Sequence, residues 1–423
     1  MKKSKYNCLI NLENEDILLY NTLSRKYILI DKSEEQKYMK LYDKVKIQNQ
    51  YFDKEEADII CKMFQKGILI KDDLNEIDVI EFNENKIRFG DQYYYLVLQP
   101  TLACNFRCTY CYEEHREDCL DDILSERILK YIDNISKRVK HLRIGWFGGE
   151  PLLELNRIIT FTREAKEICK RNNCHYSATI TTNGYLLNEE TISCLEELSI
   201  GSVQVTVDGY KKYHDEKRML ENGEGTYDII SENLKKLSYK NIKINLRVNA
   251  DEENYNNIIE IYNIIPKENR RKCSINMSNL FKNNGKLDFY DLYLNAINKG
   301  YAFYNTTNSF MTCEVCVKNG ITIEPTCEVV PCSMASEKGY TFGKIDEHGN
   351  LIMENKNFFY GLKNTTALKS KKCAECIMLP MCMGKCKLSR YLNPDICNMR
   401  IPDGLSLEEI IKLHYYSDIT KIV

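Results

Sequence analysis

The sequence has no apolar run long enough to cross a membrane and almost no net charge. No stretch approaches the roughly 20 apolar residues of a membrane helix, and the N-terminus lacks the sustained apolar segment of a secretory signal. With 59 Lys and Arg against 61 Asp and Glu, the chain has no general attraction for nucleic acid or acidic lipid. These absences predict a cytoplasmic protein that binds neither nucleic acid nor membrane.

Histidine is scarce, and phosphate-binding loops are not evident. The six histidines are dispersed without a paired-ligand or triad pattern, and no glycine-rich phosphate loop occurs. Hydrolase and kinase functions therefore lack a supporting feature. No repeat or low-complexity linker interrupts the 423 residues, which are enough for two or three domains.

Cysteine, in contrast, is abundant. Nineteen cysteines in a reducing compartment indicate metal binding rather than disulfides. Three of them, Cys104, Cys108 and Cys111, lie in the short run TLACNFRCTYCYEEH. Zinc prefers four ligands in a closed tetrahedron, whereas a [4Fe–4S] cluster held by three thiolates leaves one iron open. Three close cysteines without a fourth nearby fit the open cluster better.

Residues 91–305 alternate between strand-like and helix-like patterns. Six apolar runs predict parallel strands buried on both faces, at 94–98, 142–147, 177–181, 203–207, 242–248 and 273–277. Helical patterns separate them, for example at 121–139 and 155–171. The alternation implies a parallel α/β sheet, and the cysteine run falls on the loop after the first strand, where barrel enzymes place their chemistry.

The spacing Cys-x3-Cys-x2-Cys, with Tyr110 before the last cysteine, resembles the radical S-adenosylmethionine (SAM) superfamily. The resemblance implies a partial (β/α)6 TIM-like barrel and a catalytic [4Fe–4S] cluster held by Cys104, Cys108 and Cys111. In that superfamily the open iron chelates SAM. An electron from the reduced cluster cleaves SAM to methionine and a 5′-deoxyadenosyl radical, which takes a hydrogen atom from the substrate.

Further residues at the strand ends resemble the SAM-binding segments of that superfamily. The tetrapeptide after the second strand matches the Gly-Gly-Glu-Pro motif letter for letter: Gly148, Gly149, Glu150 and Pro151. Arg218 is a candidate ligand for the methionine carboxylate, because a guanidinium group can donate two parallel hydrogen bonds to a carboxylate. The other cofactor contacts implied by the resemblance are Tyr110, Thr182, Asn183 and Thr206. Arg247, at the end of the fifth strand, could face substrate, SAM or a neighbouring helix.

Nine cysteines concentrate in residues 306–423, in an order that resembles the SPASM extension of radical SAM enzymes. The resemblance implies two auxiliary [4Fe–4S] clusters, and therefore three in all. The distal cluster would be held by Cys373, Cys376, Cys382 and Cys397. The proximal one would be held by Cys316, Cys332 and Cys386, with Cys313 as the expected fourth ligand. Without Cys313, this cluster would keep an iron open for a substrate thiolate. Cys327 stands at a turn where the family usually has glycine, and it is either a ligand or, as we favour, an exposed thiol.

Residues 1–90 predict a winged-helix-like domain. We expect strands at 7–12 and at 17–30, the latter broken near 21–25, helices at 34–45 and 53–65, and a two-stranded wing at 68–70 and 77–82. Asp53 and Glu56 predict a capping box, and Gly67 a helix stop. The domain resembles the peptide-recognition element of peptide-modifying enzymes, where a leader peptide adds a strand to the sheet edge. The alternative is a structural cap without a ligand.

The three predicted domains, at 1–90, 91–305 and 306–423, together resemble maturases of ribosomally made peptides. We expect an oxidoreductase that cross-links a precursor peptide, and we favour a cysteine thioether as in sactipeptides and ranthipeptides. A reductase, flavodoxin or ferredoxin would be the electron donor. The alternatives are an anaerobic sulfatase maturase that forms formylglycine, a carbon–carbon cross-linking or epimerising peptide enzyme, a non-enzymatic iron–sulfur electron carrier and a zinc-binding regulator. Sulfatase maturases typically carry Asp after the hairpin cysteine, where this chain has Ser333.

Overall fold

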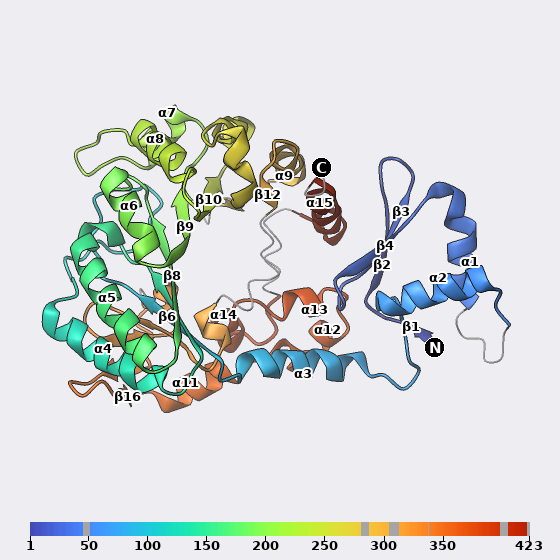
Figure 1. The fold of residues 1–423 in the computed structure, drawn as a ribbon, viewed down its shortest axis with the longest axis horizontal. Coiled ribbons are helices and arrows are strands. Elements are labelled where there is room, and N and C mark those ends of the chain that lie inside the picture. Colours follow the sequence, from blue (N-terminus) through green and yellow to red (C-terminus); the bar gives the residue numbers. More distant parts are fainter. Residues whose placement is uncertain (45–50, 281–286, 304–312, 337, 398–404, 421–423) are drawn as a thin grey trace.

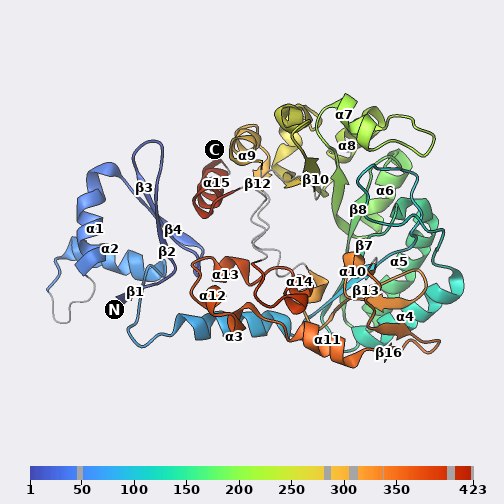
Figure 2. The ribbon, with the colours of Figure 1, turned by 180° about the vertical axis from the view of Figure 1, so that it is seen from behind.

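The computed structural model describes the chain apart from residues 45–50, 281–286, 304–312, 337, 398–404 and 421–423. The N-terminal domain and the barrel lie at opposite ends, and much of the cysteine-rich C-terminal region lies between them (Figure 1). Helix α3 (Glu76–Arg88) runs along one edge from the N-terminal domain toward the barrel in both views (Figure 2). No helix within the described ranges is long and apolar enough to cross a membrane.

The N-terminal domain packs an antiparallel sheet against two helices. Its elements are β2 (Asn7–Asn11), β3 (Ile17–Asn21), β4 (Lys26–Ile30), α1 (Glu35–Lys44) and α2 (Lys54–Gln65). Apolar residues of β3, β4, α1 and α2 share one core, which includes Leu19, Ile28 and Met63. Ile10 of β2 belongs instead to the larger core that contains the barrel strands. The capping box of Asp53 and Glu56 is confirmed, as is the turn at Gly67, which has a left-handed φ of 76°.

The prediction of a second wing strand at 77–82 is wrong. Strand β5 (Leu69–Ile70) pairs with β1 (Lys2–Lys3), whereas residues 77–82 belong to helix α3. Asn75 caps this helix by accepting a hydrogen bond from the Ile77 N–H at 3.1 Å. The short apolar segment IDVIEF fits either a strand or a helix by its pattern, and tertiary packing decides.

The barrel strands run parallel and are neighbours in chain order. They are β6 (Tyr93–Leu98), β7 (His141–Trp146), β8 (His175–Thr182), β9 (Ile200–Thr206), β10 (Lys243–Ala250) and β11 (Cys273–Asn279), followed by the short β12 (Ala302–Phe303). Helices surround them (Figure 1): α4 (Asp122–Ser136), α5 (Leu155–Arg171), α6 (Glu189–Glu197), α7 (Lys211–Lys217), α8 (Tyr227–Leu237) and α9 (Tyr290–Asn298). All six predicted strands and the α/β fold are confirmed.

The strands are not buried on both faces, which corrects the prediction. In β7 the buried Leu142, Ile144 and Trp146 alternate with the partly exposed Arg143 and Gly145. The buried set packs against the helices, and the alternate set faces the barrel interior. Much of this inner set is polar or basic: Arg143, Ser177, Thr179, Thr181, Ser202, Gln204, Thr206, Asn245, Arg247, Asn249, Ser274, Asn276 and Ser278. None of these positions is acidic, so the strands give the interior a polar and locally positive lining.

The C-terminal residues extend the barrel sheet. Strand β13 (Gly320–Ile323) pairs in parallel with β6, and β14 (Glu328–Val330), β15 (Gly343–Ile345) and β16 (Leu351–Met353) continue it antiparallel to an eleven-stranded sheet. The helices of this region are α10 (Ser333–Ser336), α11 (Lys356–Lys363), α12 (Lys371–Ala374), α13 (Leu379–Cys382), α14 (Lys387–Leu392) and α15 (Leu407–Thr420). The hairpin before Cys332 is thereby fixed beside the strand that leads into the cysteine loop.

Buried charges fix α3 to this C-terminal region. Glu84 is 1% exposed, accepts a hydrogen bond from Thr366 Oγ1 at 2.7 Å, and lies 3.4 Å from Arg88 and 3.5 Å from Lys387. Arg88 also donates to the carbonyl of Lys363 at 2.7 Å. Separating α3 from the C-terminal region would leave these charges unpaired, which is costly for buried groups.

Candidate active site

The three clustered cysteines lie on the loop that follows β6. Backbone pairing of Thr101 with Cys119 holds the loop closed. Burial raises the pKa of Cys104 to about 12, opposed by a hydrogen bond from the Phe106 N–H and increased by the nearby Cys108 and Cys111. The other two loop thiols thus act on the pKa of Cys104.

The Gly-Gly-Glu-Pro segment supports this loop directly. The Gly149 N–H donates to the Thr101 carbonyl at 3.2 Å, and the Glu150 N–H donates to the Ala103 carbonyl at 2.8 Å. A Cβ at Gly148 would lie 2.4 Å from the Thr101 carbonyl oxygen, and one at Gly149 only 2.2 Å from that of Ala103. The two glycines are needed because the cysteine loop passes so close to them.

Glu150 is a fully buried carboxylate that joins neighbouring loops. It accepts hydrogen bonds from Thr182 Oγ1 and from the Asn183 N–H, both at 2.7 Å. Burial raises the pKa of Glu150, and these hydrogen bonds oppose the rise. The Asn183 side chain donates to Asn105 Oδ1 of the cysteine loop at 2.8 Å, while Pro151 opens a short 3-10 helix (Pro151–Glu154). Thr182 and Asn183 thus organise the loop in this structure.

A second network surrounds Tyr110. Its hydroxyl donates to Asp208 and accepts hydrogen bonds from Arg218 at 3.0 Å and from Asn249 Nδ2 at 3.3 Å. Asp208 also accepts a hydrogen bond from the Asn249 N–H at 2.8 Å. Burial raises the pKa of Asp208, whereas the Arg218 charge lowers it. These contacts connect the cysteine loop to the ends of β9 and β10.

Arg218 has an unused donor inside this network. Its Nε is buried and has no hydrogen-bond partner in the described part of the chain, and its guanidinium carbon lies 5.7 Å from the centre of the Phe106 ring. An unsatisfied buried donor costs about 1–3 kcal/mol. A carboxylate bound beside the cysteine loop would satisfy it, so the residues present fit a cofactor that carries one.

Two predicted residues lie at the inner ends of strands. Thr206 ends β9 and pairs in register with Arg247 of β10. Arg247 faces the barrel interior, and its Nε donates to Asn249 Oδ1 at 3.2 Å, so the structure does not support a position against a neighbouring helix. Sequence reasoning missed Asp208 and Asn249 as site residues, because Asp208-Gly209 by itself has the composition of a routine turn.

The structure pairs several auxiliary-cluster cysteines. A hydrogen bond between the Cys313 and Cys316 thiols raises the pKa of Cys313 and lowers that of Cys316. Cys332 has a raised pKa, mainly through burial and with contributions from Glu314 and Cys386. Residues predicted for the proximal cluster thus lie near one another.

The predicted distal ligands also lie in one region. Burial is the main cause of the raised pKa of Cys382, and both Cys397 and Cys373 contribute to it. Arg390 donates to Cys373 Sγ at 3.5 Å, while Cys376 interacts electrostatically with Tyr6 of the N-terminal domain. Among the described residues, no group of three potential ligands is arranged to hold a metal ion.

Cys327 is buried rather than exposed, which corrects the favoured prediction. It is 1% exposed, and burial raises its pKa to about 11. Its sulfur lies 3.7 Å from the Leu124 carbonyl oxygen of α4, and its φ of 66° is left-handed, as expected where the family has glycine. The charges that affect it are Arg127 and Asp121, not other cysteines.

The cysteine loop and the C-terminal hairpin meet at one contact. The Tyr112 hydroxyl, next to Cys111, lies 3.4 Å from Ser333 Oγ, next to Cys332. The two cysteine regions are therefore adjacent although they are far apart in the sequence.

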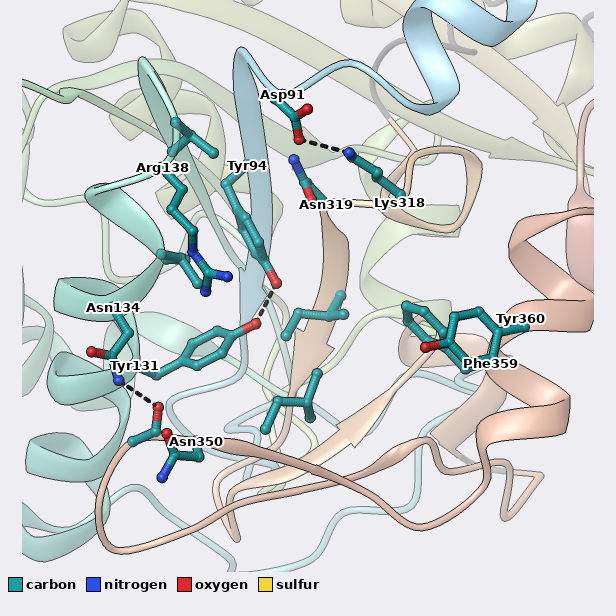
Figure 3. Close-up of a pocket in the computed structure, with 15 residues that line it drawn as sticks. Asp91, Tyr94, Tyr131, Asn134, Arg138, Lys318, Asn319, Asn350, Phe359 and Tyr360 are labelled. Atoms are coloured by element: carbon teal, nitrogen blue, oxygen red, sulfur yellow. Dashed lines mark hydrogen bonds and ion pairs between the residues drawn. The ribbon is translucent and has the colours of Figure 1, made fainter.

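A cavity of about 810 Å³ lies elsewhere, between the start of β6 and the C-terminal strands (Figure 3). Hydrogen-bonded Tyr94 and Tyr131 line it, together with an Asp91–Lys318 ion pair of 2.6 Å. No cysteine lines this cavity, and the cysteine loop follows the opposite end of β6. It is therefore separate from the candidate active site.

Residues 98–265 match the model of the Radical SAM superfamily, and this span includes the cysteine loop and the Gly-Gly-Glu-Pro segment. This part of the chain is therefore a radical SAM domain, the domain that radical SAM enzymes share. Membership implies one [4Fe–4S] cluster and SAM. The three loop thiols and Arg218 Nε, which has no hydrogen-bond partner among the described residues, are the donor types that these groups take, although the thiols are not arranged as a metal site in this structure.

Two curated proteins resemble most of the chain. It is 24% identical, over 89% of its length and 84% of the relative, to the radical SAM cyclopropyl synthase TigE of Paramaledivibacter caminithermalis. It is 25% identical, over 70% of its length and 89% of the relative, to the cysteine-type anaerobic sulfatase-maturating enzyme of Clostridium novyi.

Solved structures share the fold. The structure of native anSMEcpe with bound AdoMet and Cp18Cys peptide gives a TM-score of 0.55 at 18% identity and covers 78% of this chain and 97% of its own. Streptococcus suis SuiB bound to precursor peptide SuiA gives 0.52 at 18% identity and covers 91% of this chain and 95% of its own.

Proposed function

We propose that this radical SAM enzyme installs a cysteine thioether cross-link in a ribosomally made precursor peptide. The principal support is the packing of the N-terminal domain directly onto the cysteine-rich region. Thr22 Oγ1 donates to the Ile377 carbonyl at 2.7 Å, and Tyr6 packs with Cys316 and Leu379. SuiB, which shares the fold over 91% of this chain, has been solved with its precursor peptide.

The loop cysteines Cys104, Cys108 and Cys111 would hold the SAM-cleaving cluster. When bound, that cluster supplies the electron that converts SAM to the radical that removes hydrogen from the peptide. The chain's own residues position the reactants: Glu150 fixes the loop, and Arg218 Nε would bind the methionine carboxylate. The polar inner face of the barrel would hydrogen-bond the peptide.

Two auxiliary clusters would be held by the C-terminal cysteines. The proximal set is Cys313, Cys316, Cys332 and Cys386, and the distal set is Cys373, Cys376, Cys382 and Cys397. The Tyr112–Ser333 contact supports a substrate position between the first cluster and the proximal one. An auxiliary cluster would accept the electron left over when the carbon–sulfur bond forms. A flavodoxin or ferredoxin is the proposed donor for SAM cleavage.

The reaction is tested with the peptide encoded beside the enzyme gene, incubated anaerobically with reconstituted enzyme, dithionite and SAM. The expected product has lost two hydrogen atoms and one free thiol per cross-link, because a C–H and an S–H bond are replaced by C–S. Tandem mass spectrometry locates the bond. Formylglycine, a new carbon–carbon bond or an epimerised residue would each contradict the proposal.

The leader sequence of the peptide is proposed to bind the N-terminal domain. An open cavity of about 870 Å³ lies between α2 and α3, next to β5. Phe64, Leu74 and Phe82 line it and are exposed, with Phe82 at 69%. Exposed apolar side chains gathered in a groove indicate an interaction site, and leader peptides bind such domains in extended form.

Phe82→Glu is expected to weaken leader binding at least about tenfold, since it places a charge in an apolar groove, and tenfold corresponds to about 1.4 kcal/mol. Fluorescence anisotropy of the labelled leader measures the affinity, while peptide-independent SAM cleavage stays unchanged. Tyr239→Glu changes an aromatic of similar exposure, 62%, outside the groove and serves as control. Equal leader affinity of both variants and wild type would remove the groove from the proposal.

A further inference from the structure

We propose that the surface beside Cys373 is a docking site for an acidic one-electron carrier protein. This inference rests on the proposed distal cluster and assigns it a partner surface. Residues 363–390 contain a single acidic side chain, Glu375. Their basic residues are Lys363, Lys369, Lys371, Lys372, Lys385, Lys387 and Arg390. The chain as a whole is balanced at 59 basic and 61 acidic residues, so this excess is local.

The buried members of this set have structural partners. Lys363 Nζ donates to the carbonyls of Glu314 and Gly320, at 2.9 and 2.6 Å. Lys387 pairs with Glu84 at 3.5 Å. These contacts explain the buried cations through the packing of the region, and they leave the exposed ones without such an explanation.

The exposed lysines Lys369, Lys371 and Lys372, here called the lysine edge, have no ion pair within the described part of the chain. Exposed lysines elsewhere often have one: Lys130 lies 2.9 Å from Glu126, and Lys137 lies 2.5 Å from Asp133. The lysine edge therefore presents its charge to solvent.

This unpaired charge adjoins the distal cysteines. Lys371 and Lys372 share helix α12 with Cys373, and Lys369 ends the 3-10 helix immediately before it. Cys373 and Cys376 are partly exposed, and Cys397 is exposed. A cluster held here would lie near the surface, where a carrier protein could approach it closely.

The loop of the first cluster lacks a comparable free charge. Arg107 forms an ion pair with Glu221, and Arg116 lies 3.7 Å from Asp118 and 3.8 Å from Glu324. These carboxylates neutralise the arginines that an acidic partner would need. The contrast favours the lysine edge as the place of docking.

Charge complementarity explains why an acidic carrier fits. A patch of unpaired cations accelerates encounter with an anionic partner and orients it, and the effect weakens as salt rises. In the transfer itself, the reduced carrier would lose one electron, and a cluster held by the distal cysteines would gain it. No bond forms or breaks, and no proton moves.

The test uses the reconstituted full chain and an acidic plant-type [2Fe–2S] ferredoxin as probe. Changing Lys369, Lys371 and Lys372 together to Glu is expected to weaken ferredoxin binding at least about tenfold at low salt, as measured by calorimetry. SAM cleavage driven by reduced ferredoxin should fall with the affinity, while cleavage driven by dithionite stays at the wild-type level. The same triple change to Gln, which removes the charge without reversing it, should give an intermediate loss.

A matched control changes three exposed lysines on other helices, Lys170, Lys212 and Lys235, to Glu. Ferredoxin binding should then remain within about twofold of wild type, although the net charge changes equally. Unchanged binding by the lysine-edge variants, or an equal loss in the control, would overturn the proposal. Wild-type peptide cross-linking with dithionite tests the proposed function separately, so the two failures are distinguishable.

Discussion

Replacing Cys104 by alanine is expected to abolish the formation of 5′-deoxyadenosine from SAM. The change removes one of three thiolates that the loop can offer, and an incompletely held cluster cannot present an open iron in a fixed place. Iron content should fall by about four atoms per chain. Chromatography of the nucleoside product and an iron assay after anaerobic reconstitution measure both effects.

Cys119→Ala provides the matched control. Cys119 is exposed and pairs through its backbone with Thr101 at the base of the same loop, so the variant removes a thiol without touching the proposed ligands. Its iron content and SAM cleavage should equal those of wild type. Appreciable 5′-deoxyadenosine from Cys104→Ala would contradict the assignment of the loop.

Gly149→Ala is expected to give the second large loss. The new methyl group would lie 2.2 Å from the Ala103 carbonyl oxygen, and backbone on both sides leaves neither atom free to move alone. Relief requires the cysteine loop to shift, at a cost of about 1–3 kcal/mol typical of overpacking. We expect at least about a tenfold drop in SAM cleavage, with partial loss of iron.

Gly201→Ala tests whether any added methyl group has this effect. No atom lies within 4 Å of the Cβ position at Gly201, in strand β9 of the same barrel. Iron content and SAM cleavage should be unchanged. If Gly149→Ala also retained both, the close seating of the loop would not matter for function.

The features found from sequence are those encoded by contiguous residues. The Cys104 loop, the Gly148–Pro151 segment and the capping box at Asp53 each lie within a few positions. Half-buried strands can also be recognised locally, from apolar side chains at alternate positions. These patterns were sufficient for the barrel order and for the location of the loop.

The features missed depend on contacts between distant segments. Asp208 and Asn249 end different strands, and only parallel pairing brings them to Tyr110. Residues 77–82 are helical because Glu84 and Arg88, further along the same helix, find buried partners in the C-terminal region. Apart from the Asn75 cap before residues 77–82, nothing local distinguishes such positions from a turn or a short strand.

The polar inner face is recognisable in the sequence itself, because polar and apolar residues alternate in SATITT and in SVQVTV. Interpreting them as continuously buried overlooked that a half-open barrel has helices on only one side. The burial of Cys327, in contrast, has no signal in the local sequence. Its left-handed turn was foreseeable, but its burial against α4 arises from packing between domains that were treated separately.

The continuous sheet from β12 to β16 has a consequence for dissecting this enzyme. Strand β6 hydrogen-bonds β7 on one side and β13 on the other. A fragment ending at residue 305 would leave one margin of β6 bare, with its N–H and C=O groups available to another molecule. Such fragments would self-associate, so the catalytic barrel is best studied in the intact polypeptide.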